Sequence, residues 1–298
     1  MASKFTLRGD RSFHLVATLF LGLSCAVVLY PLIYCVSCSF SSSMAIIQGR
    51  VILWPVEFSL DSYKRVLDYS LLRISFFNSV LYVLGGTTVS VVLLLLAAYP
   101  LSRRDLAYRK FFTTFFVITM FFNGGIIPNY LLMSNLHLVG SRWSLIVGFM
   151  FSCYNMIIVK SYFQSSLPHG ILDAAHIDGC DDIRFFFTIA LPLAVPVIAV
   201  MVLMNAVGIW NSYFNGILFL TTPKTHNFQM VLRNILFIAQ MPPEMLSNLD
   251  QNEVAKMSNI LQQIRYAVLV IGALPMMILY PFIQKYFIRG MMIGSLKE

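Results

Sequence analysis

The sequence predicts an all-α polytopic membrane protein, and composition and hydropathy patterning carry that prediction. Hydrophobic residues make up 58% of the 298 residues and charged residues only 11%, and the mean hydropathy is +0.76. A water-soluble fold of this composition would leave much apolar surface in water. Apolar stretches of roughly 20 residues, the length of a membrane-spanning helix, recur along the chain. We therefore expect a single transmembrane domain over residues 1–298.

About six stretches are long and apolar enough to span a membrane: residues 14–36, 75–101, 111–132, 143–163, 191–213 and 265–287. The first follows basic residues, as a secretory signal does. Its apolar core continues too long and no small-residue cleavage site follows, so we expect an uncleaved anchor. The third is the least regular, because Asn123-Gly124-Gly125 and Pro128 interrupt it.

Basic residues set the expected orientation. Arg103, Arg104, Arg109 and Lys110 crowd the short connection after the second stretch, and Lys and Arg also flank both chain ends. Because such residues accumulate on the cytoplasmic side, we expect cytoplasmic termini and long outer loops at 37–74 and 214–264. These flanks account for most of the net charge of +8, so the sequence does not indicate nucleic-acid binding.

A polar loop at about residues 164–190 interrupts the apolar pattern on the same side. It contains Asp173-Ala174-Ala175, then Asp178-Gly179, and is closed by Ile189, Leu191 and Pro192. We expect a short helix after Pro168 that ends at Gly179, with Asp181 or Asp182 capping the next helix. The two small alanines are expected on one side, where another surface can approach closely. This composition favours a docking site.

The pattern resembles the EAA loop of ABC importer permeases, E-A-A-x-x-x-G followed after nine residues by I-x-L-P, with Asp173 in place of the usual Glu. Segments 122–132 and 285–297 resemble the binding-protein-dependent carbohydrate permeases of the maltose type, in the branch of oligosaccharide and alginate importers. The resemblance runs from the first span to the C-terminus. It implies a type I ABC importer permease with a cytoplasmic coupling helix, in a bacterial inner membrane.

The resemblance also implies partners. A second homologous permease, two copies of an ABC ATPase and an extracytoplasmic solute-binding protein would act with this chain on a carbohydrate. The open classes are disaccharides, longer neutral oligosaccharides and acidic ones such as alginate fragments. The implied ATPase-coupling residues are Asp173, Ala174, Ala175, Asp178, Gly179, Leu191 and Pro192. The tail from Met291 to Lys297 is expected to pack against the ATPase subunits. ATP and Mg²⁺ would be bound by the ATPase, with no cofactor in this chain.

Enzyme and metal motifs are missing from the sequence. It contains no Walker A sequence, no H-E-x-x-H and no G-x-S-x-G, so we expect no catalytic residues. His169, His176 and Asp178 form too sparse a donor set to predict a metal site. Cys35 and Cys38 form a C-x-x-C at the end of a span without a redox context, which favours a packing role.

Polar and aromatic residues inside spans are candidates for the translocation path, because they are costly against lipid and face a cavity or a neighbouring helix. Helix–helix packing and interfacial anchoring remain alternatives for each of them. The candidates are Asn78, Asn123, Tyr154, Asn155, Asn205, Trp210, Asn211 and Ser212.

A secondary transporter or channel without an ATPase partner is the alternative function. Such a protein would show an inverted repeat or carboxylates inside its spans for ion coupling. The six apolar stretches contain no Asp or Glu. The sequence therefore favours the ATP-driven importer.

Overall fold

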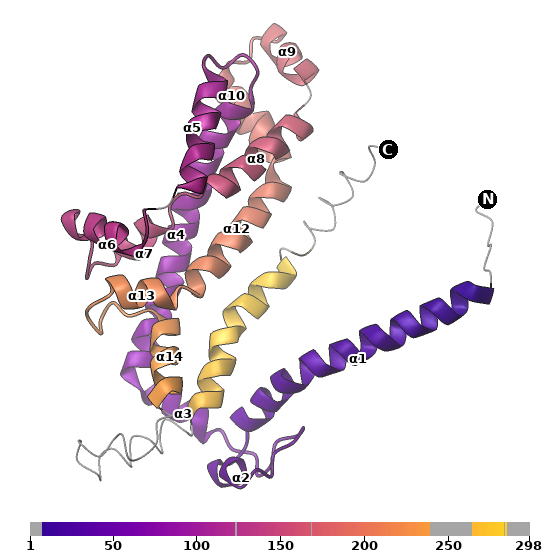
Figure 1. Cartoon of the computed structure of the whole chain (residues 1–298), viewed down its shortest axis with the longest axis vertical. Helices are drawn as coiled ribbons and strands as arrows, with labels where there is room; N and C mark the ends of the chain where they lie inside the picture. Colours follow the sequence, from indigo (N-terminus) through magenta and orange to yellow (C-terminus); the bar gives the residue numbers. More distant parts are fainter. Residues whose placement is uncertain (1–7, 123, 168, 239–263, 283, 285–298) are drawn as a thin grey trace. The chain divides into compact units, whose positions relative to one another are not determined.

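The computed structural model describes residues 8–122, 124–167, 169–238, 264–282 and 284. All regular structure among these residues is helical, which confirms the predicted all-α class (Figure 1). The chain forms two compact units, residues 1–69 with 235–272 and residues 70–234 with 273–298.

Three of the expected spans are continuous helices. The apolar parts of α1 (Arg8–Ser39), α4 (Ser70–Ser102) and the helix Ile264–Phe282 are each long enough to cross a membrane. They correspond to the first, second and sixth expected spans. Pro100 lies in the last turn of α4, two residues before the end of the helix.

The third and fourth expected spans, residues 111–132 and 143–163, are not continuous helices. The third is divided between α5 (Arg109–Phe121) and α6 (Ile126–Asn135), and Gly125 before α6 has a φ of 90° that favours glycine. The fourth is divided between α7 (Trp143–Gly148) and α8 (Cys153–Ser166). The Ser152 hydroxyl caps α8 by accepting from the Asn155 amide.

The fifth expected span begins in a bent segment. This segment consists of α10 (Asp182–Phe185), the π-helix η1 (Phe186–Ala190) and α11 (Leu191–Leu193), and it is followed by α12 (Val195–Trp210). The axis turns by 74° between residues 182–193 and 195–210. Pro196 lies in the first turn of α12, where its missing N–H leaves no helical hydrogen bond unmade.

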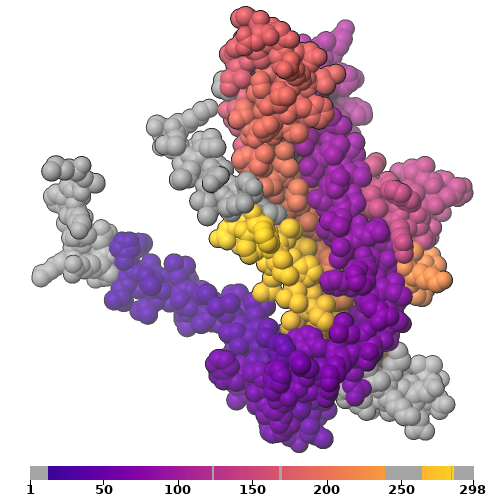
Figure 2. All heavy atoms as spheres, turned by 180° about the vertical axis from the view of Figure 1, so that it is seen from behind, coloured from indigo at the N-terminus to yellow at the C-terminus, as the bar shows by residue number. Residues whose placement is uncertain are grey.

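The second unit is a helical bundle centred on α4. Helices α8 and α12 both pack along α4, and the space-filling view from behind shows the purple surface of α4 running beside the salmon to orange segment from α9 (His169–Ile177) to α12 (Figure 2). Leu94, Met156 and Met201 are at most 1% exposed at the centre of this cluster. Gly86 permits the close approach, since a Cβ there would lie 2.7 Å from the Cδ1 atom of Ile209.

The first unit joins the end of α1 to a short folded loop. Ser41 donates to the Ser37 carbonyl at 2.7 Å and accepts from the Val56 amide at 3.0 Å. Cys38 is fully buried against Ala45 and Val51 and forms no disulfide, in agreement with the packing role expected for it. The loop carries α2 (Ser43–Ile47), and α3 (Asp61–Asp68) follows it.

Candidate functional site: the coupling loop and the spans beside it

Helix α9 is the short helix expected in the polar loop, and it ends where the sequence predicts. Gly179 has a φ of 76°, the left-handed conformation that glycine adopts most easily. Its amide donates to the His176 carbonyl at 3.0 Å, and the Cys180 amide donates to the Ala175 carbonyl at 2.9 Å. This pair of bonds is a Schellman motif, which satisfies carbonyls at the end of the helix.

Asp181 is the cap of the helix that follows. Its Oδ1 atom accepts from the Arg184 amide at 2.6 Å, as expected of an N-cap carboxylate. Asp182, the other candidate cap, is the first residue of α10. Its carboxylate binds Arg103 instead.

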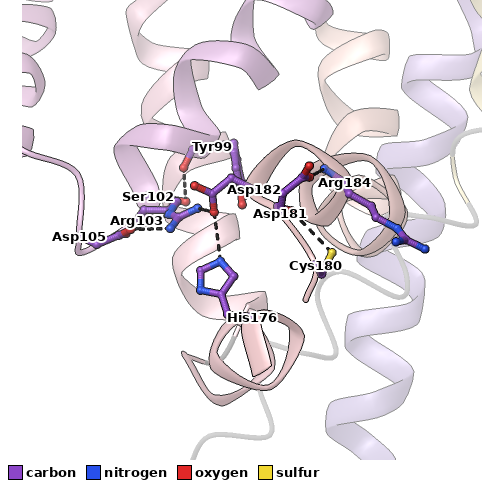
Figure 3. Close-up of polar contacts among 9 residues, drawn as sticks. All are labelled: Tyr99, Ser102, Arg103, Asp105, His176, Cys180, Asp181, Asp182 and Arg184. Atoms are coloured by element: carbon purple, nitrogen blue, oxygen red, sulfur yellow. Dashed lines mark hydrogen bonds and ion pairs between the residues drawn. The ribbon is translucent and has the colours of Figure 1, made fainter. Parts of the chain in front are cut away.

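An ion-pair network joins this loop to the end of α4 (Figure 3). Arg103, the residue after α4, donates to Asp105 through Nε at 2.9 Å and to Asp182 through Nη1. Asp182 in turn lies 3.2 Å from the Nε2 atom of His176 on α9. Figure 3 shows the Arg103 guanidinium between the two carboxylates, with the His176 ring beside Asp182. Arg103 therefore contacts both the connection after α4, in which it lies, and the coupling loop.

The electrostatics follow from these contacts. Hydrogen bonds from Arg103 hold the pKa of Asp105 below its ordinary value. The same contact with Asp105, together with Asp182, raises the pKa of Arg103, against an opposing effect of burial. All three groups are therefore charged at neutral pH. The sequence did not predict this network, because Arg103 and Asp182 are separated by 79 residues and no motif links them.

Apolar contacts seat the same loop against the bundle. Ala175 is 7% exposed, Phe185 is 1% exposed, and both belong to the cluster that contains Leu101 and Phe163. Ala174, by contrast, is exposed. The expectation that both alanines share one open side is wrong, because consecutive residues of an α-helix point about 100° apart. Only Ala174 leaves space for a second protein.

The outward side of the loop is the surface that remains for docking. Asp173, Ala174, Asp178 and Gly179 are exposed there. Ile177 on the same loop is 86% exposed. Leu191 and Pro192, which close the motif, lie in α11 just before the 74° turn.

A cavity of about 540 Å³ lies between the loop and the connection after α4. Its lining includes Arg103, Arg104, Arg109, Gln164, Asp173 and His176. Both signs of charge are present, so the cavity has no uniform preference for anions or cations.

Four of the candidate path residues have internal contacts in the second unit. Asn205 accepts from the Ser90 hydroxyl at 3.0 Å and so joins α12 to α4. Asn78 donates to the carbonyls of Lys224 and His226 at 2.9 and 3.1 Å. The remaining two are Trp210, which stacks on Phe228 with ring centroids 6.1 Å apart, and Ser212, whose carbonyl accepts from Asn227. These contacts hold helices and the loop at residues 220–227 together.

The other candidates lie elsewhere. Tyr154, in the first turn of α8, is 58% exposed. Asn155 beside it is 8% exposed, and Asn211 at the end of α12 is exposed. Asn123 and the tail from Met291 to Lys297 lie outside the described residues. Within the described part of the chain, no group of three or more His, Cys, Asp or Glu is arranged to hold a metal ion.

Comparison with known proteins identifies the class to which this bundle and loop belong. The family of binding-protein-dependent transport system inner membrane components matches residues 90–293, which include α4 from Ser90 onward and the whole coupling loop. The chain belongs to this family.

Individual relatives cover nearly the whole chain. Protein LplC of Bacillus subtilis (strain 168) is 36% identical over 293 residues, covering 97% of this chain and 96% of that protein. The polygalacturonan/rhamnogalacturonan transport system permease protein YtcP of the same organism is 35% identical over 288 residues, covering 97% and 99%. The crystal structure of a bacterial ABC transporter involved in the import of the acidic polysaccharide alginate contains a similar chain, with a TM-score of 0.85, 32% identity and coverage of 96% and 100%.

Membership in this family confirms three predictions made from the sequence. The chain is a multi-pass membrane protein, it has the type I permease fold, and it is a transport component of an ABC importer rather than an enzyme. Such a component acts with an ATPase and with a solute-binding protein. The resemblance to ABC importer permeases is therefore confirmed, and a secondary transporter or channel is not favoured.

Proposed function

We propose that this chain is a permease subunit through which an ATP-driven importer moves oligosaccharides, above all acidic ones, across a bacterial inner membrane. The observation that carries the proposal is the similarity to the chain from the alginate importer, which extends over 96% of this chain. A second relative, at 35% identity, is named for transport of polygalacturonan and rhamnogalacturonan. Galacturonan and alginate are both polymers of uronic acids, so their fragments carry carboxylates.

The proposed assembly contains this chain, a second homologous permease, two ATPase subunits that bind ATP and Mg²⁺, and an extracytoplasmic binding protein. Both termini are placed in the cytoplasm, because basic residues crowd the connection that includes Arg103 and Arg109. The proposed orientation also puts the coupling loop on the ATPase side. A single domain with outer loops near 37–74 and 214–264 completes the proposed topology.

In this assembly the exposed side of the coupling loop docks in a cleft of the ATPase. Asp173 and Asp178 are available for basic groups of the partner, and Ala174 and Gly179 leave room for its surface. Behind that surface, Ala175 packs against the bundle. Leu191 and Pro192 lie at the start of the bend. When the nucleotide-bound ATPase closes, the loop moves and the spans attached to it rock, which opens the path to alternate sides.

The path is proposed to use the candidate set unequally. Tyr154 and Asn211 offer exposed polar surface to a passing sugar, and Asn155 lies next to Tyr154. Asn78, Asn205, Trp210 and Ser212 shape the path through the internal contacts described above. Asn123 remains a sequence-based candidate.

Uptake into proteoliposomes tests the proposal. The complete complex is reconstituted with ATP inside, and labelled oligosaccharides of mannuronate, galacturonate and glucose are supplied with the binding protein outside. We expect saturable uptake of the uronate oligomers that requires ATP and the binding protein. Uptake that proceeds without ATP would favour the secondary transporter instead, and uptake confined to the neutral glucose oligomers would contradict the acidic substrate class.

A further inference from the structure

We propose that Arg103 is a positioning residue that fastens the coupling loop to α4, so that the loop and this helix move together in the transport cycle. The inference rests on the proposed function only in assigning the loop to the ATPase. It adds a residue that lies outside the EAA-like motif and has no counterpart among the motif positions.

The first step of the argument is where Arg103 lies. It immediately follows Ser102, the last residue of α4, so its backbone cannot move far without that helix. Its carbonyl also accepts from Nη1 of Arg109 at 3.3 Å, which ties the start of the connection to the start of α5. The guanidinium then contacts Asp182, the first residue of α10.

The second step is that the contact reaches both helices of the loop. Asp182 also approaches His176 of α9 at 3.2 Å, so Arg103, Asp182 and His176 form a continuous polar chain from α4 to α10 and α9. The turn between α9 and α10 contains Gly179, whose backbone alone does not fix the angle between the helices. The polar chain fixes their relative position from outside the turn.

The third step concerns burial. The Arg103 side chain is 13% exposed, whereas the carboxylates of Asp105 and Asp182 belong to side chains that are 60% and 59% exposed. A pair of fully exposed charges contributes little to holding two segments, because water and salt screen it. An arginine packed into the connection and held by two carboxylates loses less to screening, and its planar fork fixes the direction of each bond.

The fourth step concerns the helices that pack on α4. Along its length α4 packs against α8, which precedes the loop, and α12, which follows it. Phe185 and Ala175 seat the loop on the same cluster through apolar contacts, which resist separation but permit sliding. The directional bonds of Arg103 oppose that sliding. A displacement of the loop is then passed to α4 as well as to the two helices that continue from it.

Coupling efficiency is the property that tests this role. The complete complex carrying Arg103→Gln is reconstituted, and the number of oligosaccharide molecules imported per ATP hydrolysed is measured. We expect a fall of about tenfold in this ratio, with the assembled complex and its basal ATP hydrolysis retained. Arg103→Lys should fall between wild type and Arg103→Gln, since lysine keeps the charge but cannot bind two carboxylates with a planar fork.

The matched control is Arg104→Gln. Arg104 is the adjacent arginine, lines the same cavity and is exposed, so the substitution removes the same charge from the same face. We expect import per ATP to stay near wild type. An equal fall in both variants would overturn the proposal, because it would show a general effect of positive charge on ATPase docking.

A double-mutant cycle identifies the partner. If Arg103 acts through Asp182, then the double variant Arg103→Gln/Asp182→Asn should couple no worse than the more impaired single variant. If the fall in import per ATP in the double variant equals the product of the two single falls, the link is contradicted. A wild-type value of import per ATP in Arg103→Gln would contradict it as well.

A distance measurement separates this proposal from the proposed function. Tyr108 and Ile183 are 81% and 71% exposed on the two sides of the link, and spin labels are placed there after the native cysteines are replaced. We expect Arg103→Gln to broaden the distance distribution in the assembled complex, whereas Arg104→Gln leaves it narrow. Unchanged widths would reject the link even if sugar import is confirmed, and failure of ATP-driven import alone would reject only the proposed function.

Discussion

Asn227 and Gly216 show how single residues determine the packing of the second unit at residues 212–228. Asn227 is 1% exposed, and its Nδ2 atom donates to the Ser212 carbonyl at 3.1 Å. Its Oδ1 atom lies 2.4 Å from the position that a Cβ would occupy on Gly216 of α13 (Tyr213–Phe219). The absence of a side chain at Gly216 thus allows α13 to pack on the loop that leads to α14 (Phe228–Ile238).

Gly216→Ala should therefore destabilise the second unit by about 1–3 kcal/mol, because Asn227 must move and its buried hydrogen bond is weakened. The matched control is Gly208→Ala on α12, where an added Cβ meets no atom of the described part of the chain within 4 Å. Chemical unfolding of the purified protein in detergent compares the two. Equal stabilities for the two variants would show that the close approach at Gly216 has no energetic weight.

Asp105 gives a prediction about pH. Its pKa is lowered in the folded protein by hydrogen bonds from Arg103, so the pair stabilises the fold above the unfolded-state pKa of about 3.9. That contribution is lost as the pH falls through the lower folded-state pKa. The difference in melting temperature between wild type and Asp105→Asn should thus stay constant from about pH 8 to 5. It should become smaller only below about pH 4. A difference that vanishes already near pH 6 would contradict the assigned pair.

At the scale of elements, the coupling loop consists of two short helices joined by a Schellman turn and attached to α4. Gly179 occupies the left-handed position of that turn, and among the described residues no atom lies within 4 Å of the position that a Cβ would take. A side chain at this position would therefore point away from this chain. A small and a large side chain at position 179 should strain the backbone equally but obstruct docking to different extents.

Gly179→Ala and Gly179→Leu form the pair that separates them. Both should strain the turn by about 1–2 kcal/mol, because an L-residue is forced into the left-handed region. Only leucine also fills the space that the docked ATPase needs, so we expect a larger loss of substrate-stimulated ATP hydrolysis and of import in Gly179→Leu. Assays of both variants in reconstituted complexes check this. Normal transport by Gly179→Leu would remove the loop from its assigned role.

Local features of the fold could be predicted from the sequence better than long-range contacts. The end of α9 at Gly179 and the cap at Asp181 depend on neighbouring residues, and both could be predicted from them. The break at residues 149–152 was not predicted, because the fourth stretch is mostly apolar and hydropathy does not register a change of direction. The inward position of Ala175 and the Arg103–Asp182 pair depend on which helices meet, and a single sequence contains no record of that.

At the scale of the whole molecule, this chain is a membrane-embedded transport component whose sequence contains no phosphate-binding motif. Family membership places ATP hydrolysis on a separate subunit. The account therefore has one central claim, that this chain converts the work of an ATPase into movement of a sugar through its coupling loop. The isolated chain should therefore neither hydrolyse ATP nor move a sugar across the membrane.

ATP hydrolysis measured in three reconstituted samples tests that claim most directly. The purified chain alone should hydrolyse no ATP. The complete complex should hydrolyse ATP faster when the sugar-loaded binding protein is added, and import should rise in parallel. The same complex assembled with the Gly179→Leu chain should lose most of that stimulation. Saturable hydrolysis by the isolated chain, or import that does not depend on ATP, would contradict the account.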